Sequence, residues 1–133
     1  MTDIKVGTAI PELVMPPISR YTLALYAGAS GDHNPIHIDS DFAKKAGMPD
    51  VFAHGMLSMA YLGRMLTNWQ PQAQLRKFGN RFAAITQLQD VITCSGKVVE
   101  MIERDGETLA RCEIQAAKEN GEQTLIGEAL VAV

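Results

Sequence analysis

The sequence predicts an α+β fold in which an antiparallel sheet wraps around one buried helix. Residues 55–69 (GMLSMAYLGRMLTNW) are apolar on nearly every face, with Arg64 as their only charge. A helix that is apolar all round is a buried helix. Strand-like runs fill residues 90–133, and dipeptides typical of tight turns separate these runs. A long buried helix followed by an antiparallel sheet indicates that the sheet packs around the helix.

The first half of the chain is predicted to be helical, with breaks. A helix is expected over residues 19–29, because Ser19 is a good N-terminal cap and two prolines precede it. A short helix is expected over residues 39–46, capped by Asp39 or Ser40.

The second half is predicted to form a three-stranded antiparallel meander. The strand-like runs cover residues 90–101 (DVITCSGKVVEM), 107–118 (ETLARCEIQAAK) and 123–133 (QTLIGEALVAV). Asp105-Gly106 and Asn120-Gly121 lie between these runs. Both dipeptides favour the positive φ angles of hairpin turns.

Length and composition exclude several classes of protein. The 133 residues fit a single domain, 1–133. A net charge of −3 argues against binding to nucleic acid. No apolar run reaches the ~18 residues of a membrane span, and the N-terminus lacks a basic-then-apolar signal region, so we expect a cytoplasmic protein. Cys94 and Cys112 match no zinc or redox motif and are expected to be reduced packing residues.

The densest group of polar residues is residues 30–39 (SGDHNPIHID). Asp32 and His37 lie five residues apart across Pro35, whose fixed φ stiffens the turn. An imidazole titrates near neutrality, and burial can raise the pKa of a carboxyl toward the same range. The two groups can therefore share a water for acid–base chemistry, with Asn34 orienting the carboxylate or the water through its NH₂. Alternatively, Asp32 caps a turn and His37 packs against an apolar neighbour.

Metal binding and nucleophilic catalysis find less support. The stretch that opens at Asp32 resembles a calcium loop, but its sixth position is His37, where glycine is needed. His33 and His37 would share a helix face, yet Pro35 between them disfavours a helix. A zinc site there stays an alternative. Ser58 has no G-x-S-x-G elbow around it, so it is not indicated as a nucleophile.

A second polar cluster, residues 53–56 (AHGM), begins the predicted buried helix. Gly55 lies in the first turn, where backbone N–H groups have no partner within the helix. A free N–H there can donate to a carbonyl oxygen that becomes an enolate, and glycine lets a ligand approach closely. A glycine needed only for helix entry and close packing is the alternative.

Residues 26–57 resemble the MaoC-like (R)-specific enoyl-CoA hydratases, the hydratase 2 group. The hallmark of that family, a run of small residues followed by G-D-x-N-P-[apolar]-H, is matched at every position by residues 26–37 (YAGASGDHNPIH). The H-G-M motif follows at residues 54–56, after Phe42-Ala43. The chain is most similar to the short single-domain members, which include (3R)-hydroxyacyl-acyl-carrier-protein dehydratases.

The resemblance implies a hot-dog fold, with residues 55–68 as its central helix. It implies that Asp32 and His37 form a catalytic dyad, that Asn34 supports them, and that the Gly55 N–H binds the thioester carbonyl. The implied reaction is reversible hydration of a trans-2-enoyl thioester of CoA or acyl carrier protein, giving the (3R)-hydroxyacyl thioester. No cofactor and no metal are implied. A homodimer or larger homo-oligomer is expected, and a heterodimer is possible.

Candidate substrate-binding residues come from two regions. The acyl tail needs an apolar channel, and methionine adapts well to variable pockets. Ordinary core packing is the alternative for each apolar candidate, as solvated surface is for each basic one. The channel candidates are Met56, Met59, Leu62 and Met65, and the candidates for contacting the thioester handle are Lys44, Lys45, Arg76 and Lys77.

Three other functions stay open at this point. They are hydrolysis of acyl thioesters, a subunit that needs a partner chain for activity, and dehydration of substrates carried only by acyl carrier protein. The spacing of Asp32 and His37 favours the hydratase. One segment departs from the family pattern. Arg81-Phe82 resemble the start of a strand in that family. Residues 86–90 (TQLQD) lack the proline and glycine of the turn usually found after that strand, which predicts a reshaped turn.

Overall fold

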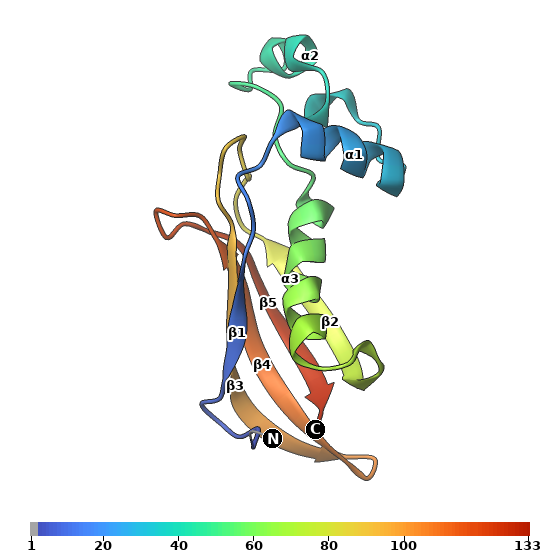
Figure 1. The fold of residues 1–133 in the computed structure, drawn as a ribbon, viewed down its shortest axis with the longest axis vertical. Coiled ribbons are helices and arrows are strands. Elements are labelled where there is room, and N and C mark those ends of the chain that lie inside the picture. Colours follow the sequence, from blue (N-terminus) through green and yellow to red (C-terminus); the bar gives the residue numbers. More distant parts are fainter. Residues whose placement is uncertain (1–2) are drawn as a thin grey trace.

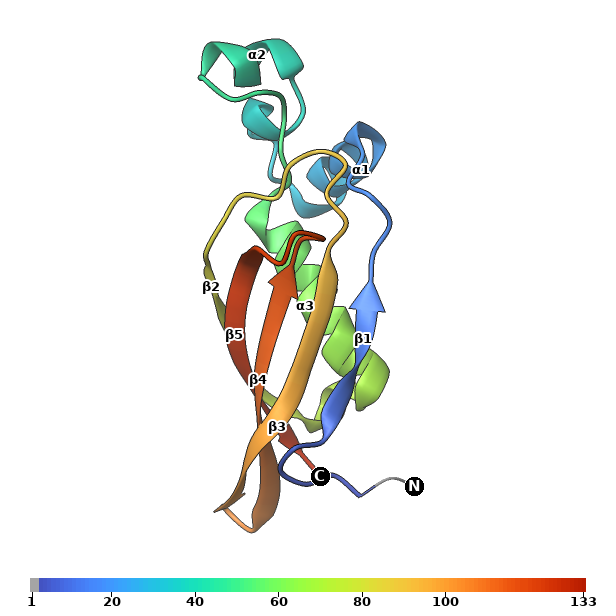
Figure 2. The same ribbon diagram turned by 90° about the vertical axis from the view of Figure 1, so that its left-hand side faces the viewer.

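A computed structural model describes residues 3–133. Five strands form one antiparallel sheet in the order β1-β3-β4-β5-β2, and the sheet curves around helix α3 (Gly55–Trp69) (Figures 1 and 2). Helices α1 and α2 lie beyond one end of the sheet, near the start of α3 (Figure 1). The other elements are β1 (Ala9–Val14), α1 (Arg20–Ser30), η1 (Pro35–His37), α2 (Ser40–Lys45), η2 (Gln72–Gln74), β2 (Leu75–Phe82), β3 (Thr93–Arg104), β4 (Glu107–Ala117) and β5 (Gln123–Ala132).

The predicted meander is confirmed as β3, β4 and β5, although β3 begins and ends later than the predicted run. Asp105 and Gly106 both take positive φ, 52° and 78°, as the hairpin prediction requires. At the second turn only Gly121 does so, with φ 88°. Asn120 contributes differently, because its side-chain oxygen accepts the N–H of Glu122 at 2.9 Å.

Strand β1 was not predicted. Arg81-Phe82, which the resemblance placed at the start of a strand, instead end β2, and both strands lie at the edges of the sheet. Pro11 cannot donate a ladder hydrogen bond, so it is tolerated only where a strand is at an edge or bulged. The β1–β3 register does shift between Ile10 and Leu13. In β2 (LRKFGNRF), charged residues and Gly79 obscure the alternation of apolar and polar side chains.

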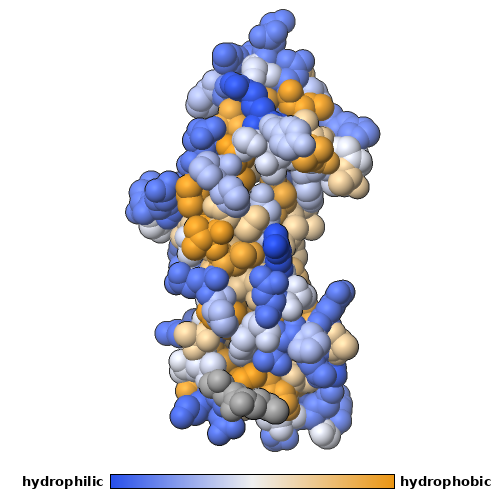
Figure 3. Space-filling model, viewed as in Figure 1, coloured by the Kyte–Doolittle hydropathy of each residue, from blue (hydrophilic) through white to orange (hydrophobic). Residues whose placement is uncertain are grey.

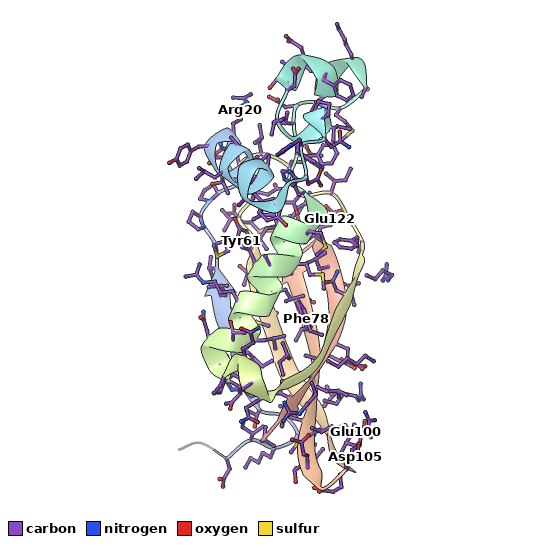
Figure 4. The ribbon with its side chains drawn as sticks, turned by 90° about the vertical axis from the view of Figure 1, so that its right-hand side faces the viewer. Arg20, Tyr61, Phe78, Glu100, Asp105 and Glu122 are labelled. Atoms are coloured by element: carbon purple, nitrogen blue, oxygen red, sulfur yellow. The ribbon has the colours of Figure 1, made fainter. Side chains whose placement is uncertain are left out.

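Helix α3 packs one side against the sheet. Leu62, Met65 and Leu66 are almost fully buried in the main core. Phe78 of β2 lies against the same helix (Figure 4), and a Cβ at Gly63 would come within 3.1 Å of its ring. The expectation of burial on every face is wrong for the single chain, because Met56 is 54% exposed and Arg64 is exposed.

Buried cysteines lie in the sheet, as predicted. Cys94 and Cys112 are free and form part of the main core. Burial raises the pKa of the Cys94 thiol to about 12 and that of Cys112 to about 11, which makes both poor nucleophiles near neutral pH. Within residues 3–133, no helix combines the length and apolarity needed to cross a membrane.

Asp50 ties together the segments that surround the start of α3. Its carboxylate accepts a hydrogen bond from the Ser40 hydroxyl at 2.6 Å and one from the Val51 N–H at 2.7 Å, and it pairs with Arg20. These bonds hold the pKa of Asp50 at about 2, below its ordinary value of 3.8. The carboxylate thereby joins α1, α2 and the chain that leads to α3.

The loop between β2 and β3 holds a residue in the left-handed backbone region, and the reshaping of its turn relative to the family stays a prediction. Gln89 takes a left-handed conformation with φ 69°, where glycine is favoured. Its N–H donates to the Ile18 carbonyl at 2.8 Å, and Lys118 pairs with Asp90 at 3.1 Å. These contacts hold a strained residue in place.

Replacement of Gln89 by glycine is expected to stabilise the protein by about 1 kcal/mol, because glycine adopts this φ without a steric cost. Urea unfolding measures the change. Gln87→Gly is the matched control, because Gln87 has no positive φ. Glycine at that position only raises the conformational entropy of the unfolded chain, so it brings no stabilisation. A Gln89→Gly protein no more stable than wild type contradicts the assignment of strain.

Asp50→Asn is expected to destabilise the protein above pH 4 and to matter little near pH 2. The folded-state pKa of about 2 lies below the ordinary 3.8, so the carboxylate's contribution is complete above 3.8 and is lost as the pH falls toward 2. Urea unfolding of both proteins across this range measures the gap. A gap that stays constant would show that Asp50 is not the acid-sensitive group.

Candidate active site

The candidate site begins where α1 ends. Gly31 closes the helix with φ 79°, and its N–H donates to the Ala27 carbonyl. Asp32 follows on an exposed loop, and its carboxylate oxygen Oδ1 accepts the Asn34 N–H at 3.2 Å. Asn34 in turn caps η1, because its Oδ1 accepts the Ile36 N–H at 3.1 Å. Consecutive side chain to main chain bonds therefore shape this loop.

His37 ends η1 and is buried, with 9% of its surface exposed. Its Nδ1 lies 2.8 Å from the Phe52 carbonyl oxygen, and its ring packs edge-on against the Phe52 ring. A carbonyl oxygen only accepts hydrogen bonds, so Nδ1 carries the proton. In neutral His37 this leaves Nε2 with a free lone pair, ready to accept a proton or a hydrogen bond.

Asp32, His37 and His54 form one cluster. A carboxylate oxygen of Asp32 and one nitrogen of each histidine lie within 4.8 Å of one another. Two hydrogen bonds of about 2.8 Å each allow one water to bridge groups up to roughly 5 Å apart. The cluster is compact enough for a divalent cation as well, but His37 Nδ1 and His54 Nε2 already face carbonyl oxygens. His33, paired with His37 in the zinc alternative, is exposed and outside the cluster.

A cavity of about 340 Å³ opens beside the first turn of α3. Gly55 lies on its wall, and no hydrogen bond from the Gly55 N–H is found within residues 3–133. Two buried hydroxyls also line it, those of Ser58 and Thr86, which lie 3.5 Å apart. The remaining lining residues are Phe52, Ala53, Phe82, Ala83, Ala84, Ile85, Thr124 and Leu125. Asp32 and His37 are not on the wall, but Phe52, which accepts from His37, is.

The sequence matches a profile of the MaoC-like domain over residues 6–120. The chain belongs to the MaoC-like domain family. It shares 29% identity over 133 residues with the (R)-specific enoyl-CoA hydratase of Rhodospirillum rubrum, covering 98% of this chain and 89% of that protein. With the mitochondrial 3-hydroxyacyl-[acyl-carrier-protein] dehydratase of Arabidopsis thaliana it shares 27% over 129 residues, covering 96% and 76%.

Other relatives are far longer than this MaoC-like chain. It is 36% identical over 66 residues to the fatty acid synthase subunit beta of Saccharomyces cerevisiae. The aligned segment covers 50% of this chain but 3% of that subunit. Among solved structures, R-hydratase PhaJ1 from Pseudomonas aeruginosa superposes with a TM-score of 0.84 at 27% identity, covering 97% of this chain and 82% of that one. The expected hot-dog fold is thereby confirmed.

The candidate binding residues of this MaoC-like chain are only partly brought to the site. Met56, Met59, Leu62 and Met65 do not line the cavity, and Leu62 and Met65 lie in the main core. Their assignment to the acyl channel stays a prediction. Lys44 and Lys45 are exposed on α2, next to η1. The other basic pair is engaged elsewhere, since Arg76 binds Glu107 and Lys77 binds Glu128.

Two residues that shape the site, Phe52 and His54, were given no role by the sequence analysis. Phe52 orients His37 through its main-chain carbonyl, which no side-chain pattern reveals. His54 is 1% exposed and stacks on His37, with ring centroids 4.0 Å apart. Its position next to Gly55 was the available signal. Asn34, expected to orient the dyad through its NH₂, contacts Asp32 through its main-chain N–H instead.

Proposed function

We propose that this chain catalyses the reversible hydration of trans-2-enoyl thioesters to (3R)-hydroxyacyl thioesters. One observation carries the proposal: a carboxylate oxygen of Asp32 and a ring nitrogen of His37 lie within 4.8 Å, close enough to hold one water. The hydratases and dehydratases among the relatives support the same reaction class. Asp32 and His37 form the catalytic dyad, and Asn34 supports it.

The dyad activates the water. With its Nδ1 proton committed to the Phe52 carbonyl, neutral His37 accepts a hydrogen bond from the water at Nε2 and orients it. Asp32 accepts the second water proton and is the principal base. The two groups are coupled, so an exchange of these roles gives the same products. Neither residue needs a cofactor to hold or move this proton.

The water supplies both the hydroxyl group that adds to C3 and the proton that adds to C2. The water oxygen bonds to C3 of the enoyl thioester while the C2–C3 double bond opens, and electron density moves onto the thioester oxygen. The proton taken by the dyad then returns to C2 on the same face. The enzyme regains its starting protonation state, and the reverse sequence expels water from the (3R)-hydroxyacyl thioester.

The negative charge that develops on the thioester oxygen needs a donor. The Gly55 N–H lies in the first turn of α3, is not engaged by other described residues, and borders the cavity. A fixed donor at a helix N-terminus stabilises such an oxyanion without reorganising in the reaction. We assign this role to Gly55.

The cavity of about 340 Å³ accepts the acyl chain in this proposal, and a partner subunit completes its wall. Met56, Phe82 and Ile85 are 54%, 53% and 44% exposed, and Phe82 and Ile85 lie on the cavity wall. On the face shown in Figure 3, which carries α3 and β1, apolar surface also interrupts the hydrophilic surface. Such patches are typical of protein–protein interfaces, which supports a homodimer or larger homo-oligomer.

Removal of either dyad member is expected to lower hydration of crotonyl-CoA by at least ~10²-fold, because a positioned acid or base contributes ~10²–10⁴-fold. Asp32→Asn keeps the Oδ1 that accepts the Asn34 N–H. His37→Ala removes the imidazole, and His37→Asn retains a donor for the Phe52 carbonyl while removing Nε2. Loss of the enoyl absorbance measures the rate.

Asp41→Asn and His33→Ala are the matched controls, because both side chains are exposed and outside the cluster. They are expected to hydrate crotonyl-CoA at close to the wild-type rate. A folded Asp32→Asn or His37→Asn protein with full activity rules out the dyad.

The thioester handle is tested by comparing crotonyl-CoA with crotonyl-acyl carrier protein at equal concentration. We expect turnover of both, with the larger kcat/KM identifying the handle that the chain recognises. Lys44 and Lys45 are the basic side chains proposed to contact it, so Lys44→Ala/Lys45→Ala raises KM for that handle and leaves kcat unchanged. Release of free thiol in place of hydration identifies a thioester hydrolase and overturns the proposal.

A further inference from the structure

His54 is the buried titratable side chain that the proposed mechanism does not use. It is 1% exposed and precedes the first residue of α3, yet its side chain makes no capping bond to that helix. Its Nδ1 has no hydrogen-bond partner among the described residues. A buried nitrogen without a partner destabilises a fold, so the imidazole requires another explanation.

The contacts of His54 lead to both members of the dyad. Its Nε2 lies 3.2 Å from the main-chain carbonyl of Asp32. Its ring stacks on His37 with an interplanar angle of 28°, and Tyr26 of α1 packs edge-on against it, with ring centroids 4.8 Å apart. His54 therefore touches the backbone that presents the carboxylate and the ring that presents the imidazole.

The chemistry of these contacts sets the state of His54. The Asp32 carbonyl only accepts, so Nε2 carries the proton and Nδ1 is bare. Burial, and then repulsion from His37, lower the pKa of His54, against the opposing influence of Asp32. The ring is therefore neutral near pH 7 and can stack on His37 without charge repulsion.

A comparison with phenylalanine isolates what the imidazole adds. A phenyl ring would fill the same space and stack on His37 without burying a bare nitrogen. It could not donate to the Asp32 carbonyl. The Nε2–H donor is thus the property that histidine supplies here.

We propose that His54 is a positioning residue for the hydration reaction: its Nε2–H holds the Asp32 main chain, and its ring fixes the plane of His37. This inference rests on the proposed function. His54 contacts no reacting atom and acts through the dyad. A displacement of about 1 Å in a reacting group can lower a rate by ~10²-fold, so even a small movement of the Asp32 loop lowers turnover.

The test compares His54→Phe, which keeps an aromatic ring but has no hydrogen-bond donor, with His54→Gln, which has a donor but no ring. His54→Phe is expected to lower kcat for crotonyl-CoA by at least ~10-fold, with KM within about twofold of wild type, because binding groups stay in place. His54→Gln restores a donor near the Nε2 position and is expected to recover part of the kcat lost in His54→Phe. His33→Gln is the control, because His33 is an exposed histidine next to Asp32, and it is expected to keep wild-type kcat.

Thermal unfolding of the same proteins separates positioning from a structural role. We expect His54→Phe to unfold within a few degrees of wild type while its kcat is low. The inference is overturned if His54→Phe keeps wild-type kcat, if His54→Gln recovers nothing, or if activity falls only in proportion to the folded fraction. Asp32→Asn in the same assay distinguishes the failures, because an active Asp32→Asn protein overturns the proposed function itself.

Nitrogen-15 NMR of the wild-type protein tests the same inference without a variant, should His54→Phe not fold. Nε2 of His54 is expected to show a one-bond coupling to a slowly exchanging proton, and Nδ1 is expected to show none near pH 7. A proton on Nδ1, or a cationic ring, overturns the inference.

Discussion

The arrangement of the site depends on the hydrogen bond between His37 Nδ1 and the Phe52 carbonyl, 2.8 Å long. It joins the loop that carries the carboxyl and the imidazole to the chain that enters α3. Because the carbonyl can only accept, the bond also decides which nitrogen of His37 is free. It holds the imidazole near the first turn of α3, where the Gly55 N–H borders the cavity. One contact therefore sets both the tautomer and the location of the imidazole.

Apolar burial on two sides makes that contact possible. On one side, the main core between the sheet and α3 fixes the axis of the helix. On the other, a second core joins α1, α2 and the start of α3, and includes Leu23, Ala43 and Leu57. Tyr61 packs against both cores and lies on α3 (Figure 4), and burial raises the pKa of its hydroxyl. The polar loop thus rests on elements whose positions are set by hydrophobic contacts.

Features determined by neighbouring residues could be predicted, and features determined by distant ones could not. The hairpin at Asp105 was predicted because its dipeptide is sufficient to favour the turn. Strand β1 was missed because Pro11 argues against a strand unless an edge position is already known. The site follows the same division. Asp32 and His37 share one loop and were found together, whereas His54 reaches the Asp32 carbonyl from 22 residues away and stacks on His37 only because the two cores bring these segments together.

The stacked histidines also limit how many protons the site can hold. Two imidazoles with centroids 4.0 Å apart repel each other if both are protonated, and little water is present to screen them. Burial keeps His54 neutral, and its protonated nitrogen is committed to a main-chain carbonyl. Under the proposed mechanism, the mobile proton is therefore restricted to Asp32, His37 and the substrate water. Such a restriction suits a reaction in which the proton removed from water must return to C2.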